Sequence, residues 1–332
     1  MRFATARLSL VRSALGNRAL IEYVEHDGQL YAVVASARRS RLVALGPVEP
    51  VRAARTFLDA ALARMIRRGP RHAAGSAGAF TRAASELDDL LLCPLQLDTD
   101  DVIVVPTGRL HGLAWAGLPS LRERCFCIAP SATLWLQRAH RQQDVGPNRV
   151  VIVCGPGLPG ADRETALLAR RYPNATVLAG PSATCARVLA ALEQSDFAHI
   201  AAHGVFRSDN PMFSNLRLAD GPLTIYDLER LRAVPERIVL TACETGSAFV
   251  TATDEMLGTA VALLSLGVCT VAAPSAPVPD GALSDFSLQL HDAVAARQPL
   301  RVALRQATAC ALERDDQLAF ATAVCFSAIG AG

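Results

Sequence analysis

The stretch Val150-Val151-Ile152-Val153-Cys154 is a continuous apolar run with no alternation of polar side chains. Strands of this kind are buried on both faces, which is typical of a parallel sheet covered by helices on each side. Similar runs follow, each separated from the next by a helical pattern. The pattern therefore predicts an α/β fold built on a parallel sheet. We expect strands at 149–154, 176–179, 197–202, 237–242, 268–273 and 319–329, and helices near 163–171, 183–193, 225–231, 255–266, 282–296 and 301–312.

The first hundred residues follow a different pattern. Short β-rich runs separated by turn residues predict a meander, and apolar residues at helical spacing come after it. We expect meander strands at 19–24, 30–34 and 41–45, helices at 51–68 and 79–95, a small-residue loop at 69–78 between them, and a strand at 102–106. We place the boundary between an N-terminal half, 1–147, and a second half, 148–332, where the regular strand–helix alternation begins.

Composition excludes several functional classes. The chain has 332 residues, of which 51% are hydrophobic and 19% charged, so it can bury a large core. The net charge is +2, no block of like charge stands out, and all 33 cations are arginine. The absence of lysine excludes Schiff-base and P-loop lysine chemistry. The charge pattern argues against direct binding to nucleic acids or to a membrane surface.

The nine cysteines are scattered, with no C-x-x-C pair, and most lie in apolar runs. Thiols in such positions pack as small hydrophobic groups, and a reducing cytoplasm is the simplest compartment for them. Arginines near the N-terminus argue against an export signal. The uncharged segment from Met256 to Pro279 is long enough to span a bilayer, but glycines and prolines interrupt it. We expect a buried helix followed by a buried strand, in a soluble protein.

Two expected strands end in residues that carry chemistry. His203-Gly204 follows the strand at 197–202, and Cys243-Glu244 follows the strand at 237–242. Ligand and catalytic sites of open α/β sheets form beyond the carboxyl ends of the strands, and neighbouring strands lie about 4.8 Å apart. If these two strands are neighbours, His203 could draw the proton from the Cys243 thiol, and the backbone N–H groups of Gly204 and Cys243 could hold an oxyanion. Spacing alone leaves a second interpretation open, a core thiol and a surface histidine.

The residues around these strand ends resemble the CHAT family of cysteine peptidases. Phe197–Gly204 resembles the His-Gly motif of that family, and Ile238–Gly246 resembles its Ser-Ala-Cys-Glu-Thr-Gly block. Further matching segments extend the resemblance over nearly the whole chain. They are Ala19–Val34, Val104–Trp115, Pro130–Ala132, Gly180–Thr184, Pro211–Leu218, Asp254–Gly258 and Ala303–Ala307.

The resemblance implies a caspase- and separase-like fold, a catalytic His203–Cys243 dyad and cleavage of protein substrates. It also implies that the CHAT region covers about 80–332, that an inactive, protease-like first half supports the second, and that helical repeats often precede such domains in bacterial defence or programmed death. The chain departs from the family in the segment Ala273–Asp280, which lacks the usual Trp, and at Ala202 and Thr241. These departures leave the dyad intact and put the substrate pocket in doubt.

The candidate pocket residues are Asp209, Asn210, Glu244, Ser275 and Asp280. Asp209 and Asn210 follow His-Gly and either line a pocket or belong to a solvated loop. Glu244 either orients a partner group or forms a salt bridge.

Two motifs suggest other chemistry. Gly155-Pro156-Gly157-Leu158-Pro159-Gly160 matches the dinucleotide pattern G-x-G-x-x-G, but two prolines interrupt it and the next strand ends without an acid for a ribose. We expect a rigid turn at the edge of the site. His199 and His203 have a zinc-ligand spacing for a helix, but on a strand they lie about 13 Å apart. His199 is therefore expected to pack in the core or to support the site.

These observations predict a cytoplasmic cysteine endopeptidase that needs no metal or organic cofactor. The alternative is a non-catalytic scaffold that keeps the fold. Residues 7–15 look like the end of a helix that could continue from an upstream repeat domain, so we also expect an activating partner or an upstream segment.

Overall fold

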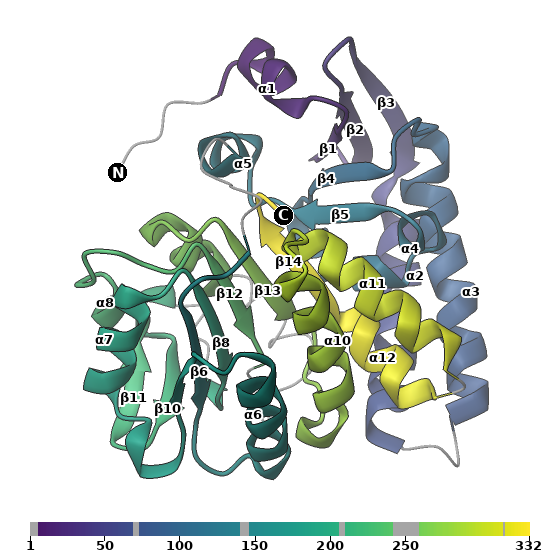
Figure 1. The fold of residues 1–332 in the computed structure, drawn as a ribbon. Coiled ribbons are helices and arrows are strands. Elements are labelled where there is room, and N and C mark those ends of the chain that lie inside the picture. The colour runs from purple at the N-terminus through teal and green to yellow at the C-terminus, as the bar shows by residue number, and fades with distance from the viewer. Residues whose placement is uncertain (1–5, 69–72, 140–145, 206–209, 242–258, 315) are drawn as a thin grey trace.

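The computed structural model describes residues 6–68, 73–139, 146–205, 210–241, 259–314 and 316–332. In this part of the chain an eleven-stranded sheet runs through the molecule in the order β3-β2-β1-β4-β5-β14-β13-β12-β8-β6-β7 (Figure 1). Its strands are β1 Ala19–His26, β2 Gln29–Ala35, β3 Ser40–Pro47, β4 Asp101–Val105, β5 Cys125–Ile128, β6 Val150–Cys154, β7 Thr176–Leu178, β8 Phe197–Ala201, β12 Arg237–Leu240, β13 Thr270–Pro274 and β14 Phe326–Gly330. A small second sheet holds β9 Gly204–Val205, β10 Asn215–Leu218 and β11 Gly221–Thr224.

The large sheet is mixed and mostly parallel. β6, β7, β8, β12 and β13 form one parallel block, and β1, β4, β5 and β14 form another. The two blocks meet where β13 pairs antiparallel with β14. β1, β2 and β3 form the expected meander, with antiparallel pairing. The predicted α/β class is therefore confirmed.

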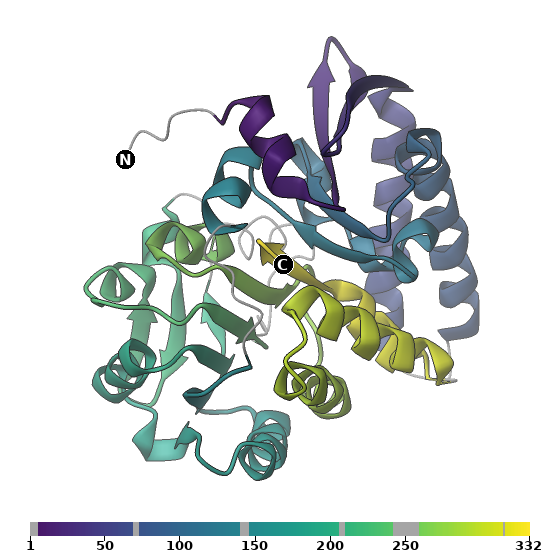
Figure 2. The same cartoon turned by 45° about the horizontal axis from the view of Figure 1, so that its top comes forward.

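Helices cover both faces of the sheet. They are α1 Leu8–Leu15, α2 Val48–Arg68, α3 Ala73–Leu91, α4 Pro119–Arg122, α5 Ala132–Ala139, α6 Pro159–Arg171, α7 Cys185–Gln194, α8 Ile225–Leu228, α10 Ser284–Ala295, α11 Leu300–Glu313 and α12 Gln317–Cys325, and residues 259–266 are also helical. α6, α10, α11 and α12 pack one against the next, and α12 contacts α2 and α3 (Figures 1 and 2). This continuous layer brings helices from both halves of the chain onto one hydrophobic core.

The expected strand at 319–329 is wrong over its first part, because residues 317–325 form α12. Asp316 begins this helix, since its Oδ1 accepts from Leu318 N at 2.9 Å and from Ala319 N at 3.1 Å. The last five residues of the helix are all buried. A helix buried on every side carries no 3.6-residue periodicity, so its sequence does not differ from that of a buried strand.

The expected loop at 69–78 is also wrong over its second part, because α3 begins at Ala73. Gly75 and Gly78 lie inside the helix, where each costs about 1 kcal/mol relative to alanine. Packing of α3 against α2 and burial of its apolar face outweigh that cost, and Phe80 of α3 is fully buried with its ring edge-on to Phe320 of α12.

The uncharged segment Met256–Pro279 lies around β13. Its described part is a helix, 259–266, followed by the buried strand β13, as the sequence predicted. No helix in the described ranges has both the length and the apolar composition needed to cross a membrane.

One ion pair joins the two halves of the chain and gives a stability prediction. Arg301 of α11 contacts Asp101 of β4 with both Nε and Nη2, at 3.0 and 2.8 Å, and the two side chains are only 15% and 18% exposed. We expect Asp101→Asn to lower the free energy of unfolding by about 2–3 kcal/mol, because it leaves a largely buried guanidinium without its counter-charge. Urea unfolding measures this.

A matched control is Asp285→Asn at the exposed Arg314–Asp285 pair, whose Nη1–Oδ2 distance is 2.9 Å. An exposed pair of this kind contributes about 0–1 kcal/mol. Equal losses in the two variants would contradict the assignment of the Arg301–Asp101 pair as a stabilising contact between the halves.

Candidate active site

The candidate site lies at the carboxyl ends of the second parallel block. β8 pairs in parallel with β6 on one side and β12 on the other, so the two strands singled out from the sequence are neighbours. The pairing continues past the strands, where Gly155 N donates to Ala201 O at 2.7 Å and Thr241 N donates to Ile200 O at 3.0 Å. His203 follows the last residue of β8, Ala201, by two residues. Cys243 follows Thr241 by two residues and lies outside the described residues, as does Glu244.

His203 is held by contacts to both its side chain and its backbone. Its Nε2 lies 3.3 Å from Gly157 O, in the turn after β6, and its own carbonyl accepts from Arg217 N at 2.8 Å. A carbonyl oxygen can only accept, so this contact requires the hydrogen of the imidazole to be on Nε2. The neutral ring then has its lone pair on Nδ1, the nitrogen that could take a proton from a thiol.

The glycines of the turn after β6 allow this approach. A Cβ on Gly155 would lie 2.7 Å from Arg217 O and 3.0 Å from the Cβ of Ala202, so no larger residue fits. Gly157 has a φ of +81°, and its added Cβ would lie 3.6 Å from His203 Nε2. Crowding at Gly155 and the positive φ at Gly157 both favour glycine, which supports the interpretation of a turn at the edge of the site.

Gly204 begins the small sheet. It is the register partner of Leu216 in β10, and Val205 is the partner of Asn215. β10 in turn pairs with β11, and the Thr224 hydroxyl caps the following helix α8 by accepting from Asp227 N at 3.2 Å. This small sheet therefore fixes the backbone that carries His203-Gly204.

The candidate pocket residues have different settings. Asn210 is exposed, and its Oδ1 accepts from Met212 N at 3.3 Å across a short turn. Ser275 follows β13, donates its N–H to Cys325 O at 2.7 Å and lines a small cavity of about 20 Å³ with His111 and Ser327. Asp280 begins a single 3₁₀ turn, Asp280–Ala282. Asp209 lies outside the described residues.

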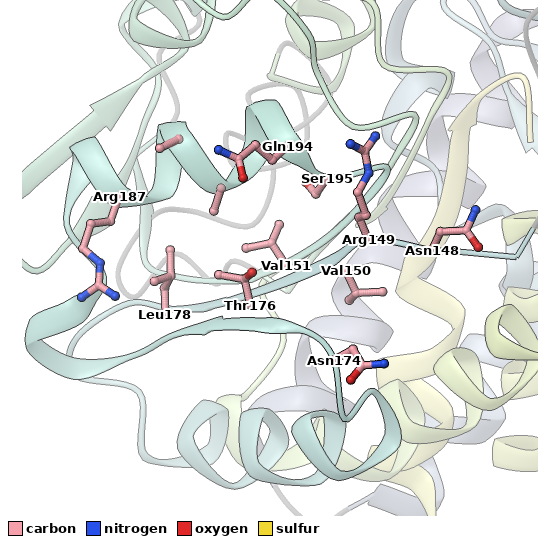
Figure 3. Close-up of a pocket in the computed structure, with 12 residues that line it drawn as sticks. Asn148, Arg149, Val150, Val151, Asn174, Thr176, Leu178, Arg187, Gln194 and Ser195 are labelled. Atoms are coloured by element: carbon pink, nitrogen blue, oxygen red, sulfur yellow. The ribbon is translucent and has the colours of Figure 1, made fainter.

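A larger hollow lies elsewhere on the molecule. It has a volume of about 510 Å³ and is lined by residues of α7 and of the strands β6 and β7 (Figure 3). Arg149 and Ser195 lie at its rim, just before β6 and β8 begin. This hollow is therefore at the opposite end of the strands from His203.

The sequence is matched by the family model of the CHAT domain over residues 81–321. This match covers most of the chain. The chain belongs to the CHAT family. No curated protein matches it.

Solved structures show the same fold at low sequence identity. Two crystal structures of the Saccharomyces cerevisiae separase–securin complex match with TM-scores of 0.62 and 0.61, each at 10% identity and over 97% of this chain. The chain spans about 30% of the separase chain. The fold is thus separase-like.

The CHAT match begins inside α3, yet the meander before it belongs to the same sheet, because β1 pairs with β4. Sequence reasoning missed the groups that surround the histidines of this CHAT chain. They include the Gly157 carbonyl, Glu164, Tyr172 and His291. The two close glycines were the one available signal for the first of these, and the others lie too far away along the chain to be recognised.

Proposed function

We propose that the chain is a cysteine endopeptidase whose nucleophile is Cys243 and whose general base is His203. The observation that carries this proposal is the parallel pairing of β8 with β12, since it makes the segments with these two residues leave neighbouring strand ends. The Gly157 contact supports it by orienting the imidazole with its lone pair on Nδ1.

In the proposed reaction His203 takes the thiol proton, and the Cys243 thiolate attacks the scissile carbonyl of a peptide. Backbone N–H groups of Gly204 and Cys243 stabilise the oxyanion, and His203 returns the proton to the leaving amine. Water then hydrolyses the thioester. An imidazolium beside a thiol lowers its pKa from about 8.5 into the range of roughly 3.5–7.5, so the thiolate is present at neutral pH.

We further propose a protein substrate and control by a protein partner or an upstream segment, in bacterial defence or another regulated proteolysis. A protease active without restraint would damage its own cell, and the separase structure that this fold resembles is a complex with securin. Residues 1–147 then act as the supporting half, with 148–332 as the catalytic half. The scattered cysteines favour a reducing cytoplasm.

Labelling with iodoacetamide at pH 7 tests this function against the non-catalytic scaffold. Burial raises the pKa of the Cys127 thiol to about 12 and that of Cys154 to about 11. Their thiolate fractions at pH 7 are roughly 1 in 10,000 or lower, so they react slowly. Cys310 is exposed and serves as the internal reference. A pKa lowered from about 8.5 to about 7 raises the thiolate fraction at pH 7 from roughly 3% to roughly 50%, and the weaker nucleophilicity of the less basic thiolate offsets part of that gain. We therefore expect Cys243 to react about threefold to tenfold faster than Cys310.

Peptide mass spectrometry after timed quenching gives the rate for each cysteine. The matched control is His203→Gln, which removes the base and keeps a polar side chain. Equal rates for Cys243 and Cys310 in the wild type, or no change in His203→Gln, would favour the scaffold.

A further inference from the structure

A buried chain of polar groups lies beneath the candidate site. His199 in β8 and His291 in α10 are both fully buried, and His199 Nδ1 lies 3.0 Å from His291 Nε2. His291 Nδ1 lies 3.1 Å from Tyr172 Oη, and the Tyr172 hydroxyl donates to His291 O at 3.1 Å. α6, which ends just before Tyr172, packs side by side with α10, which carries His291 (Figure 1).

At its other end, this buried chain of polar groups reaches the strand ends of the candidate site. His199 Nε2 lies 3.4 Å from Thr241 Oγ1 and 3.4 Å from Glu164 Oε1. Thr241 precedes Cys243 by two residues, and His199 precedes His203 by four. One imidazole therefore contacts the end of β12 while it belongs to β8.

Hydrogen-bond accounting fixes the proton positions at His291. The Tyr172 hydrogen goes to a carbonyl, so Tyr172 Oη must accept from His291 Nδ1. Burial, and then the neighbouring His199 and Arg171, lower the pKa of His291 well below its usual value, so the ring is neutral and its Nε2 accepts. The hydrogen between the two imidazoles is therefore on His199 Nδ1.

The charge at Glu164 determines the second ring nitrogen of His199. The Glu164 side chain is 1% exposed, and neither of its oxygens has a hydrogen bond in the described part of the chain. A protonated carboxyl would have to donate to His199 Nε2 over 3.4 Å, which is long for an O–H hydrogen bond, whereas a carboxylate there is compensated by an adjacent cation. That cation is the imidazolium of His199, which needs a hydrogen on Nε2 as well.

The charged groups around His199 and Glu164 have contacts of their own and do not supply the counter-charge of Glu164. Arg171 is bound to Asp292, with Nε and Oδ1 2.7 Å apart, and Arg237 stacks on Phe197 at 5.6 Å. Asp162 accepts from the Cys154 thiol at 3.5 Å. Burial raises the pKa of that thiol, and the negative charges of Asp162 and Glu164 raise it further.

We propose that His199 is a positioning residue for the site: as an imidazolium paired with Glu164, it holds the end of β12 against β8 through the Thr241 hydroxyl. This contact sets the separation between the segments that carry His203 and Cys243. The effect on Cys243 rests on the proposed function, but the charge on His199 does not.

The first test measures the charge on His199 in the full chain with ¹⁵N-labelled histidine at pH 7. We expect both ring nitrogens of His199 to show the shifts of a protonated imidazole, with the signals assigned by their loss in His199→Gln. The near-isosteric Glu164→Gln removes the counter-charge, and we expect it to convert His199 to a neutral ring. A neutral His199 in the wild type, or a spectrum unchanged by Glu164→Gln, would overturn the proposal.

The second test measures the alkylation rate of Cys243 with iodoacetamide in Thr241→Val and Thr241→Ser. Valine keeps the volume and loses the hydroxyl, so we expect a rate lower by about fivefold to tenfold, the usual effect of one buried hydrogen bond. Serine keeps the hydroxyl, and we expect it to stay within about twofold of the wild type. Melting temperatures show that each variant is folded.

The two proposals fail in different ways. A fast wild-type Cys243 that is unaffected by Thr241→Val would reject the positioning role and leave the proposed function standing. A wild-type Cys243 no faster than Cys310 would reject both the proposed function and the positioning role, even if the ¹⁵N spectrum showed the imidazolium.

Discussion

Cys243→Ala is expected to reduce cleavage of a diverse peptide library to background, a loss of at least about 10⁴-fold, because no other group replaces a missing nucleophile. His203→Ala is expected to lower kcat by about 10²–10⁴-fold, the usual contribution of a general base. Cleavage by the wild type and both variants is followed by mass spectrometry of the same library, which also shows the residue preferred before the cut.

The matched control for these variants is Cys310→Ala. Cys310 lies on α11 and is exposed, so its loss should leave cleavage unchanged. Persistent cutting by Cys243→Ala would show that another group performs the reaction. Because activation by a partner is part of the proposal, the library is also tested with cell extract added to each purified variant.

The geometry at His203 explains why removing its imidazole should lower kcat strongly. Its ring is oriented by a carbonyl 46 positions earlier in the chain, with Nε2 and Gly157 O 3.3 Å apart, and its backbone is fixed by Arg217. An oriented base needs no rearrangement before it takes a proton, which is the main advantage of a preorganised site. Removing the imidazole therefore removes both the base and its positioning.

Local sequence patterns were sufficient for the strands that position the candidate site, but not for the last segment of the chain, where α12 replaces the first part of an expected strand. Continuous apolar runs predicted β6, β8, β12 and β13, and the rule that sites form at strand carboxyl ends selected His203. The runs did not predict that β14 would enter the sheet between β5 and β13 and join two parallel blocks. That placement depends on contacts between segments about 200 residues apart, which no local pattern encodes.

The buried histidines show the same limit of prediction from local sequence. The position of His199 on a buried strand predicted a packed or supporting residue, and the structure buries it completely. Its partners His291 and Glu164 come from two different helices, 92 residues after it and 35 residues before it. Such partners are fixed by helix packing, so the sequence indicated the residue but not its role.

Gly330→Ala tests the joint between the two parallel blocks and has the largest expected effect on stability. Gly330 ends β14 with a φ of +117°, and an added Cβ would collide with the Cys269 carbonyl oxygen and lie 2.7 Å from Leu264 Cδ2. We expect a loss of about 4 kcal/mol in the free energy of unfolding, with roughly 2 from backbone strain and roughly 2 from overpacking. Urea unfolding measures it.

Gly28→Ala separates the two contributions. Gly28 also has a positive φ, +72°, but nothing lies within 4 Å of an added Cβ. This variant therefore pays for the backbone conformation alone, about 1–2 kcal/mol. If the two variants lose equal stability, steric crowding at β14 contributes nothing. A clearly larger loss in Gly330→Ala shows that close contact of β14 with the residue before β13 holds the two blocks together, and with them the strand ends of the site.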